Sequence, residues 1–240
     1  MKKNIEIRNC FLTGATGGLG REIAKQLVKH GYNIFLTSTN KKSLKKLTTE
    51  LTTINNNSEI YYEAGDLNNT NNINKIIQKC RKSFSSIDIL INCAGVFMVK
   101  SLQESSLNDF EESFNVNIRA PFIFSKEFSK DMIGKKWGRI INIGSSSSYS
   151  GFKDTSIYCS SKHAILGFSR SLHSELKNKN VRTITISPGS VKTPMGKKVK
   201  GQKFKEFIDP TEISQVLITC LNLDKNMVID EIRLNRMYMS

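Results

Sequence analysis

Short apolar runs alternate with amphipathic stretches along the 240-residue chain. Apolar positions at three- and four-residue spacing predict helices between the runs, with long helices near 107–133 and 156–178. Repeated strand–helix–strand units predict an α/β fold with a doubly wound parallel sheet and helices on both faces. The seven predicted strands are Cys10–Thr13, Asn33–Thr37, Ile60–Ala64, Ile87–Ile91, Arg139–Ile143, Val181–Ile186 and Met227–Ile232.

The chain shows no internal division. It has neither a Pro/Gly/Ser-rich linker nor a repeat of solenoid length, so we expect one domain over residues 1–240. The basic start precedes no apolar secretory core, and no apolar run approaches the ~18 residues that span a bilayer. These features predict a cytoplasmic protein without a membrane partner.

The cysteines and the net charge limit the partners. The five cysteines are scattered, with no CxxC pair or zinc-like spacing, which predicts reduced thiols and no metal. A net charge of +15 could indicate nucleic acid, an anionic membrane or an acidic substrate. The lysines, however, are spread among many asparagines, and no basic block is interleaved with aromatic residues. We interpret the charge as a solvated surface and expect no specific nucleic-acid partner.

A glycine-rich turn follows the first predicted strand and opens an amphipathic helix. Gly14 permits the tight turn, Gly18 lets the backbone approach a pyrophosphate, and Gly20 allows the helix to pack closely on the strand. Such a string can also be a turn without a ligand, but its place between strand and helix favours a dinucleotide site. The predicted cofactor-binding residues of this turn are Gly14, Thr16, Gly18, Leu19 and Gly20.

The end of the second strand bears on the choice of cofactor. A carboxylate at this place would bind the ribose 2′-hydroxyl of NAD. This chain has Ser38, Thr39 and Asn40, followed by two lysines, so nothing acidic repels a 2′-phosphate. The segment therefore favours NADP(H), with NAD(H) still possible. The alternative is an ordinary helix cap with solvated lysines.

A tyrosine–lysine pair is the candidate for proton transfer. Tyr158 and Lys162 are four residues apart and share one face of a predicted helix. A nearby lysine charge favours the phenolate, so Tyr158 could act as acid or base near neutral pH. Tyr149 and Lys153 repeat the spacing, but they straddle a Ser-Gly turn signal. We therefore assign proton transfer to Tyr158 and Lys162.

Together these motifs resemble the short-chain dehydrogenase/reductase family, in particular members like the 3-oxoacyl-acyl-carrier-protein reductases. The resemblance covers residues 9–195 and implies a single-domain Rossmann fold that transfers a hydride between a nicotinamide and a carbonyl or secondary alcohol. The matching residues are Thr13, Gly14, Gly18, Gly20, Asn92, Ala94, Gly95, Asn117, Ser145, Tyr158, Lys162, Pro188 and Gly189.

The resemblance also implies a role for each site residue. Tyr158 would be the general acid/base, and Lys162 would bind the nicotinamide ribose and lower the pKa of Tyr158. Ser145 would hydrogen-bond the substrate oxygen, although Ser146–Ser148 adjoin it, and Asn117 would hold a relay water. Cys93 replaces a more usual asparagine without changing the backbone role. Further cofactor contacts would be Asp66, Leu67, Asn92, Ala94, Gly95, Pro188, Gly189, Val191 and Thr193.

The segment at about 194–209 would cover the substrate. Its lysines at 197, 198, 200, 203 and 205 could form a basic mouth for an anionic substrate, such as a carrier-protein thioester, a coenzyme A ester or a sugar nucleotide, or a solvated lid. The last predicted strand lacks the Asp-Gly-Gly ending of many 3-oxoacyl-acyl-carrier-protein reductases, and this weakens the assignment to that group. By resemblance, the two long helices would form a homodimer or homotetramer interface.

The same residues are compatible with other functions. A non-catalytic NAD(P)-sensing or scaffold protein could use the same fold, although the Tyr, Lys and Ser of the site are all present. An NAD-linked alcohol or sugar dehydrogenase is a further alternative. A sugar-nucleotide epimerase would need a larger C-terminal domain than this chain provides.

Overall fold

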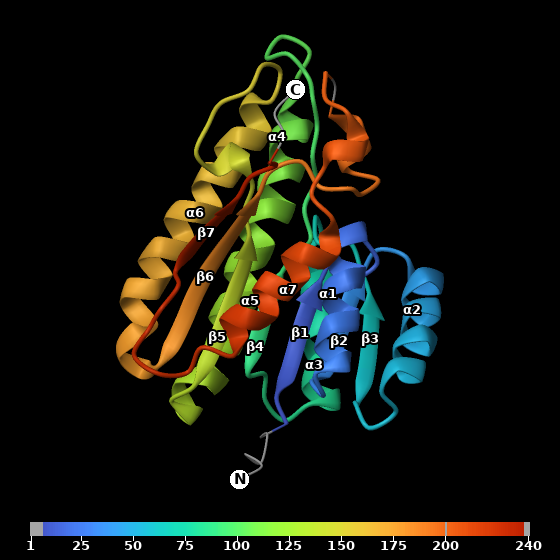
Figure 1. Ribbon diagram of the computed structural model, residues 1–240, viewed down its shortest axis with the longest axis vertical. Coiled ribbons are helices and arrows are strands. Elements are labelled where there is room, and N and C mark those ends of the chain that lie inside the picture. Colours follow the sequence, from blue (N-terminus) through green and yellow to red (C-terminus); the bar gives the residue numbers. More distant parts are fainter. Residues whose placement is uncertain (1–6, 200, 238–240) are drawn as a thin grey trace.

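The computed structural model describes residues 7–199 and 201–237, and these form a seven-stranded parallel sheet between two layers of helices (Figure 1). The strand order β3-β2-β1-β4-β5-β6-β7 confirms the predicted doubly wound Rossmann fold. The strands are β1 Asn9–Thr13, β2 Asn33–Ser38, β3 Ile60–Ala64, β4 Ile89–Asn92, β5 Gly138–Ile143, β6 Val181–Pro188 and β7 Glu231–Leu234. The order reverses between β1 and β4, and such a reversal opens a crevice at the carboxyl ends of the strands.

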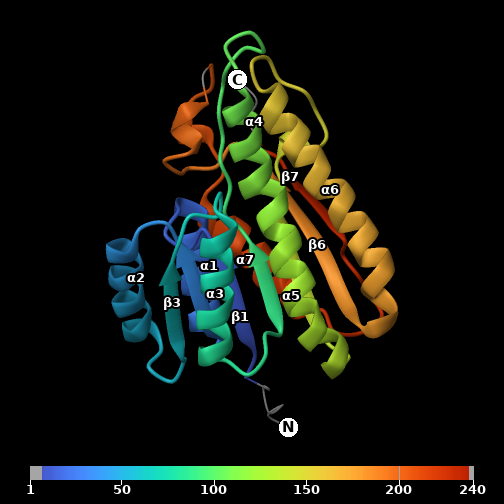
Figure 2. The same ribbon diagram turned by 180° about the vertical axis from the view of Figure 1, so that it is seen from behind.

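The helices divide between the faces of the sheet. The first face carries α1, α2 and α7, and the second carries α3, α5 and α6 (Figures 1 and 2). The helices are α1 Gly18–Lys29, α2 Lys41–Ile54, α3 Thr70–Ser83, α4 Leu107–Phe114, α5 Ala120–Lys135, α6 Ser156–Leu176 and α7 Pro210–Leu221. No helix of the described ranges is both long and apolar enough to cross a membrane.

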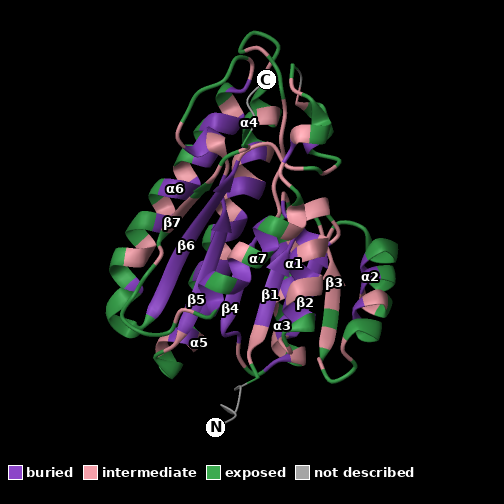
Figure 3. Ribbon diagram, in the orientation of Figure 1, coloured by how far each residue is buried: buried purple, intermediate pink, exposed green. Residues whose placement is uncertain are grey.

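Strand alternation builds a separate core on each face. In β1, Leu12 packs with α1 and α2, whereas Phe11 points to the other face. The Phe11 ring lies 4.8 Å from Phe124 and 4.7 Å from Phe128, both on α5. Figure 3 shows the central strands buried between the helical layers. Because both faces are covered, these strands are almost continuously apolar.

The structure differs from the predicted elements near the chain end. The last strand was expected at Met227–Ile232 but occupies Glu231–Leu234, and the sequence pattern did not single out α7. Two buried arginines explain the later start of β7. Arg182 donates to the backbone carbonyls of Leu223, Lys225 and Met227, and Arg139 also donates to Leu223. These hydrogen bonds hold the connection out of the sheet.

The long helix predicted near 107–133 is divided into α4 and α5 by a five-residue π-helix, Asn115–Arg119. A capping box at Ser106 and Asp109 starts α4. The wider π turn inserts a residue into the helical register, which rotates Asn117 relative to a continuous α-helix. The side chain of Asn117 is buried at this point.

Candidate active site

The glycine turn between β1 and α1 has no room for side chains. Gly14 has a φ of 67°, which favours glycine, and a Cβ there would lie 2.8 Å from the Cα of Ala94. A Cβ on Gly20 would lie 2.2 Å from the carbonyl oxygen of Gly14, and one on Gly18 would lie 2.6 Å from the Thr193 methyl group. The turn therefore brings bare backbone to the N-terminus of α1, as a pyrophosphate site requires.

The ends of β1 and β4 are tied together beside this turn. The Thr13 hydroxyl accepts hydrogen bonds from the backbone N–H groups of Cys93 and Ala94, both at 3.0 Å. The Asn92 amide donates to Asn142 Oδ1 at 2.8 Å. Its own Oδ1 is buried with no partner among the described residues. Cys93 contributes only its backbone N–H to the hydrogen bond with Thr13, so a cysteine can replace the more usual asparagine at this position.

The end of β2 lies next to the glycine turn. The hydroxyl oxygens of Thr16 and Ser38 are 2.5 Å apart, so these two predicted cofactor residues share a hydrogen bond. Asn40 instead caps α2, because its Oδ1 accepts from the Ser43 N–H at 2.9 Å. No carboxylate stands at the strand end. The cap alternative therefore holds for Asn40, while Thr16 and Ser38 form a hydroxyl pair.

The predicted adenine side is at the end of β3. Asp66 is exposed, and its Oδ1 accepts a hydrogen bond from the Asn68 backbone N–H at 2.9 Å. Leu67 is buried, and Arg119 from the π-helix donates to the Asn68 carbonyl at 2.7 Å. The turn after β3 is thus held from the same segment that presents Asn117.

Tyr158 and Lys162 lie on the first turns of α6, and both are buried. Burial raises the pKa of Tyr158 to about 12, and a side-chain hydrogen bond with Ser145 opposes this rise. The Phe97 ring packs edge-on against the Tyr158 ring, with centroids 4.7 Å apart. The protein surroundings therefore raise the pKa of Tyr158, contrary to the expected lowering, and keep the phenol protonated at neutral pH.

Lys162 is held by backbone. Its Nζ donates to the Ile143 carbonyl oxygen at 2.8 Å and lies 5.8 Å from the Tyr158 ring centroid. Burial lowers the pKa of Lys162 to about 8, and the Cys93 thiol opposes this shift. The ammonium group is thus desolvated but still charged at neutral pH.

Ser145 follows β5 and begins a short 3-10 turn, Ser146–Ser148. The Ser145 hydroxyl accepts from the Ser147 N–H at 3.1 Å, and the Ser148 hydroxyl accepts from the Ser145 N–H at 3.2 Å. The turn buries Ser147 and Ser148. Of this serine run, Ser145 is the one whose side chain hydrogen-bonds Tyr158.

Asn117 connects three segments of the site. Its amide nitrogen donates to the Val96 carbonyl at 3.1 Å and to the Ser161 hydroxyl at 2.9 Å. A Cβ on Gly95 would lie 3.2 Å from Asn117 Oδ1 and 3.8 Å from Lys162 Nζ. The loop after β4, the π-helix and α6 therefore meet at this amide.

The repeated tyrosine–lysine spacing has a different environment. Tyr149 donates to Glu231 of β7 at 3.0 Å, and the Arg233 guanidinium lies 3.3 Å from the Tyr149 ring centroid. The residues between Tyr149 and Lys153 form no helix. Tyr149 thus fastens the turn after Ser145 to the edge strand and is not part of the Tyr158 cluster.

The turn after β6 closes the site from the other side. Pro188 ends β6, and the Gly189 N–H donates to the Leu234 carbonyl at 2.7 Å. Val191 pairs with Ile208, which joins the two ends of the segment expected to cover the substrate. The lysines of this segment that the structure describes are exposed, namely Lys197, Lys198, Lys203 and Lys205; Lys200 lies outside the described residues.

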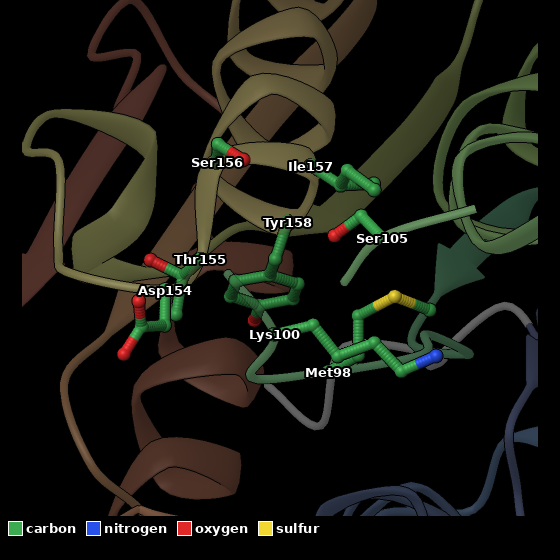
Figure 4. Close-up of a pocket in the computed structure, with 8 residues that line it drawn as sticks. All are labelled: Met98, Lys100, Ser105, Asp154, Thr155, Ser156, Ile157 and Tyr158. Atoms are coloured by element: carbon green, nitrogen blue, oxygen red, sulfur yellow. The ribbon is translucent and has the colours of Figure 1, made fainter. Parts of the chain in front are cut away.

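A small pocket opens beside Tyr158. Figure 4 shows Met98 and Lys100 next to the Tyr158 ring, with Asp154 and Thr155 on the opposite side of the view. The Lys100 N–H donates to the Asp154 carbonyl at 2.7 Å, joining the loop after β4 to the loop before α6. The sequence motifs did not single out Phe97 or Met98. Their position directly after the Asn92–Gly95 motif was the available signal.

Comparison with known proteins agrees with this geometry. Residues 8–203 match the family model described as short chain dehydrogenase, which shows that the chain belongs to that family. A 3-oxoacyl-acyl-carrier-protein reductase of Buchnera aphidicola is 32% identical over 85% of this chain and 82% of its own length. Another from Aquifex aeolicus is 30% identical and covers 98% of both chains.

A solved structure gives the same result for the fold. The alcohol dehydrogenase of the archaeon Thermococcus sibiricus, complexed with 5-hydroxy-NADP, is 25% identical with a TM-score of 0.88. The match covers 98% of this chain and 99% of that chain. The protein is therefore an NAD(P)-dependent oxidoreductase, as the sequence motifs predicted.

Proposed function

We propose that the protein reduces a ketone with NADP(H), and that Tyr158 is the general acid. The observation that carries the proposal is the cluster beside the glycine turn, in which Tyr158, Lys162 and Asn117 are buried and Ser145 is half-buried. A bound nicotinamide would supply the hydride. The tyrosine would supply the proton, so a carbonyl becomes a secondary alcohol; the reverse reaction uses the same groups.

The protein groups have separate tasks in this reaction. Tyr158 is protonated at neutral pH, which suits donation to the oxygen of the developing alcohol. Ser145 shares its hydrogen bond, so both hydroxyls can stabilise an oxyanion in the same place. Lys162 contributes a fixed positive charge and would bind the nicotinamide ribose, while Asn117 would position a relay water.

NADP(H) is proposed over NAD(H) from the end of β2. The Thr16–Ser38 hydroxyl pair and the exposed Thr39 offer donors to a 2′-phosphate, and no carboxylate opposes it. The Thermococcus sibiricus structure, which carries a modified NADP, supports the same choice. The remaining predicted contacts, from Asp66 to Thr193, follow β3, β4 and β6 at the carboxyl edge of the sheet or lie on α6.

The proposed substrate enters between the loop after β4 and the segment at about 194–209. The exposed lysines of that segment favour an anionic substrate. The two relatives from Buchnera aphidicola and Aquifex aeolicus are named as reductases of 3-oxoacyl-acyl-carrier-protein, so carrier-bound 3-oxoacyl compounds belong in the first substrate panel.

We also propose assembly of two or four copies in the cytoplasm. A groove between α5 and α6 is lined by Phe122, Phe168 and Leu172, among others, and Phe122 is half exposed. Its two phenylalanine rings pack edge to face, with centroids 6.3 Å apart. Apolar faces of this kind are typical of homodimer interfaces.

Replacing Tyr158 with Phe tests the function. NADPH oxidation is measured with acyl thioesters, sugars and small ketones, and NADPH affinity is measured by fluorescence titration. Tyr158→Phe should reduce turnover at least ~1,000-fold with little change in NADPH affinity, because proton transfer is lost and the fold is kept. The matched Tyr149→Phe variant should retain turnover. Full activity in Tyr158→Phe would overturn the assignment of Tyr158 as general acid. NADPH binding by the wild type without turnover of any substrate would instead support the scaffold alternative.

A further inference from the structure

Two cations contact one pair of phenylalanine rings in the covering segment. The rings of Phe204 and Phe207 have centroids 5.3 Å apart. Lys197 Nζ lies 5.6 Å from the Phe204 centroid, and the Arg236 guanidinium carbon lies 5.7 Å from the Phe207 centroid. Both distances fall within the range of cation–π attraction. The aromatic pair thus holds two positive charges at the rim of the site.

Arg236 reaches this place because β7 ends there. Leu234 pairs with Pro188 and its carbonyl accepts from Gly189, so the residues after β7 emerge beside the turn that closes the cofactor side. Figures 1 and 2 show the end of β7 and the covering segment at the same end of the molecule. The Arg236 backbone nitrogen therefore lies beside Gly189, 3.9 Å from where a Cβ on that glycine would be, while its side chain reaches Phe207 of the covering segment.

The carboxylates of this region are engaged elsewhere. Glu206 pairs with Lys203 at 3.7 Å, and Asp209 caps α7 by accepting from the Thr211 N–H at 2.8 Å. Within the described residues, neither Lys197 nor Arg236 has a carboxylate at ion-pair distance. Arg236 Nη1 is buried there without a hydrogen-bond partner. A buried guanidinium nitrogen without a partner is costly unless an acceptor reaches it.

We propose that Lys197 and Arg236 bind a phosphate group carried by the substrate. The proposal rests on the reductase function above and names its substrate class, a phosphate-bearing carbonyl compound. Arginine offers a planar pair of donors that matches phosphate, and lysine adds a mobile point charge. The phenylalanine pair fixes both cations, so less side-chain freedom is lost on binding.

Calorimetric titration with inorganic pyrophosphate tests the site. The protein is first saturated with NADP⁺, which fills the glycine turn and leaves the second phosphate site as the one measured. The wild type should show one saturable site. Arg236→Ala and Lys197→Ala should each weaken it at least tenfold, and Arg236→Lys should weaken it less, because charge is kept and the planar donors are lost.

The controls separate this site from general charge. Lys205→Ala removes one exposed lysine of the same segment that has no ring contact, and it should change pyrophosphate affinity less than twofold. Phe204→Leu keeps both charges but removes the ring under Lys197, and should give an intermediate loss. No saturable site in the wild type, or equal losses in Lys205→Ala and Arg236→Ala, would overturn the proposal.

NADPH affinity identifies which molecule carries the phosphate. If the phosphate belongs to the substrate, Arg236→Ala should change the Kd of NADPH less than twofold. A tenfold weaker Kd would assign the cations to the cofactor pyrophosphate and overturn the substrate assignment. The pyrophosphate titration measures binding and needs no turnover, so it can also be carried out with Tyr158→Phe. Failure of the reductase function and failure of this phosphate site are therefore distinguishable.

Discussion

The side-chain amide of Asn117 and the backbone of Val96 form a reciprocal pair of hydrogen bonds. The Val96 N–H donates to Asn117 Oδ1 at 3.0 Å, and Asn117 Nδ2 donates back to the Val96 carbonyl at 3.1 Å. The amide thus satisfies both polar groups of Val96, as a neighbouring strand would. Phe97, whose ring packs on Tyr158, is the next residue, so this pair helps to position the ring that packs against Tyr158.

Asn117→Ala should therefore affect stability and catalysis together. It removes both hydrogen bonds to Val96 and leaves a buried N–H without an acceptor, which should lower the free energy of unfolding by roughly 2–3 kcal/mol. Turnover should fall more than tenfold. Urea denaturation and NADPH oxidation measure the two effects.

Ser161→Ala is the matched control for this prediction. It removes the hydroxyl that accepts from Asn117 and donates to the Tyr158 carbonyl, and it leaves the Val96 pair in place. We expect a loss near 1 kcal/mol, with turnover within a few-fold of the wild type. Equal effects in the two variants would contradict the assigned role of the Val96 pair.

The buried charge of Lys162 should lower the free energy of unfolding. Its pKa is about 8 in the folded protein, below the ordinary 10.5, because burial disfavours the charge. Between these values the unfolded chain binds more protons, so this contribution to stability rises with pH from about 8 to 10.5. The buried charge costs about 3 kcal/mol at pH 7.

Lys162→Met tests this cost. At pH 7 we expect the variant to be more stable than the wild type by ~1–3 kcal/mol, since the lost hydrogen bond to Ile143 offsets part of the gain. The difference should shrink as the pH rises toward 10.5, and turnover should be lost at every pH. Urea denaturation at pH 7 and pH 10 measures it. If Lys162→Met were less stable than the wild type at pH 7, the stability cost assigned to the buried Lys162 charge would be contradicted.

The sequence predicted the fold well because strand and helix periodicities are local. The strand Ile60–Ala64 was predicted with its observed bounds, and the glycine turn lies where its spacing placed it. The start of β7 was wrong because Arg139 and Arg182 hold the preceding connection through contacts distant in sequence. The direction of the Tyr158 pKa shift was also missed, since it depends on burial that local spacing does not reveal.

Gly20 offers a test of the cofactor turn. A Cβ at this position would lie 2.2 Å from a backbone oxygen, so Gly20→Ala forces the turn to move. We expect NADPH affinity to fall at least tenfold and stability to fall by roughly 1–3 kcal/mol. Fluorescence titration and thermal unfolding measure these losses.

Gly134→Ala is the control for Gly20→Ala, made at a glycine with open space around it. Gly134 lies near the end of α5, and an added Cβ meets nothing within 4 Å. The change should raise stability by ~0.5–1 kcal/mol and leave NADPH affinity unchanged. If both alanine variants bind NADPH like the wild type, the turn is not the binding site.

The π-helix at Asn115–Arg119 has a consequence for how this chain can vary. Deleting one residue from it would let α4 and α5 join as one regular α-helix, which is the more common and better hydrogen-bonded form. The shorter chain would still fold around the same core, but Asn117 would turn away from Val96 and Ser161. The deletion would leave the Val96 N–H without its acceptor, so the more regular helix would come at a cost in stability. The extra residue thus lets one amide join the loop after β4 to α6, a contact that a regular helix through the same positions would not make.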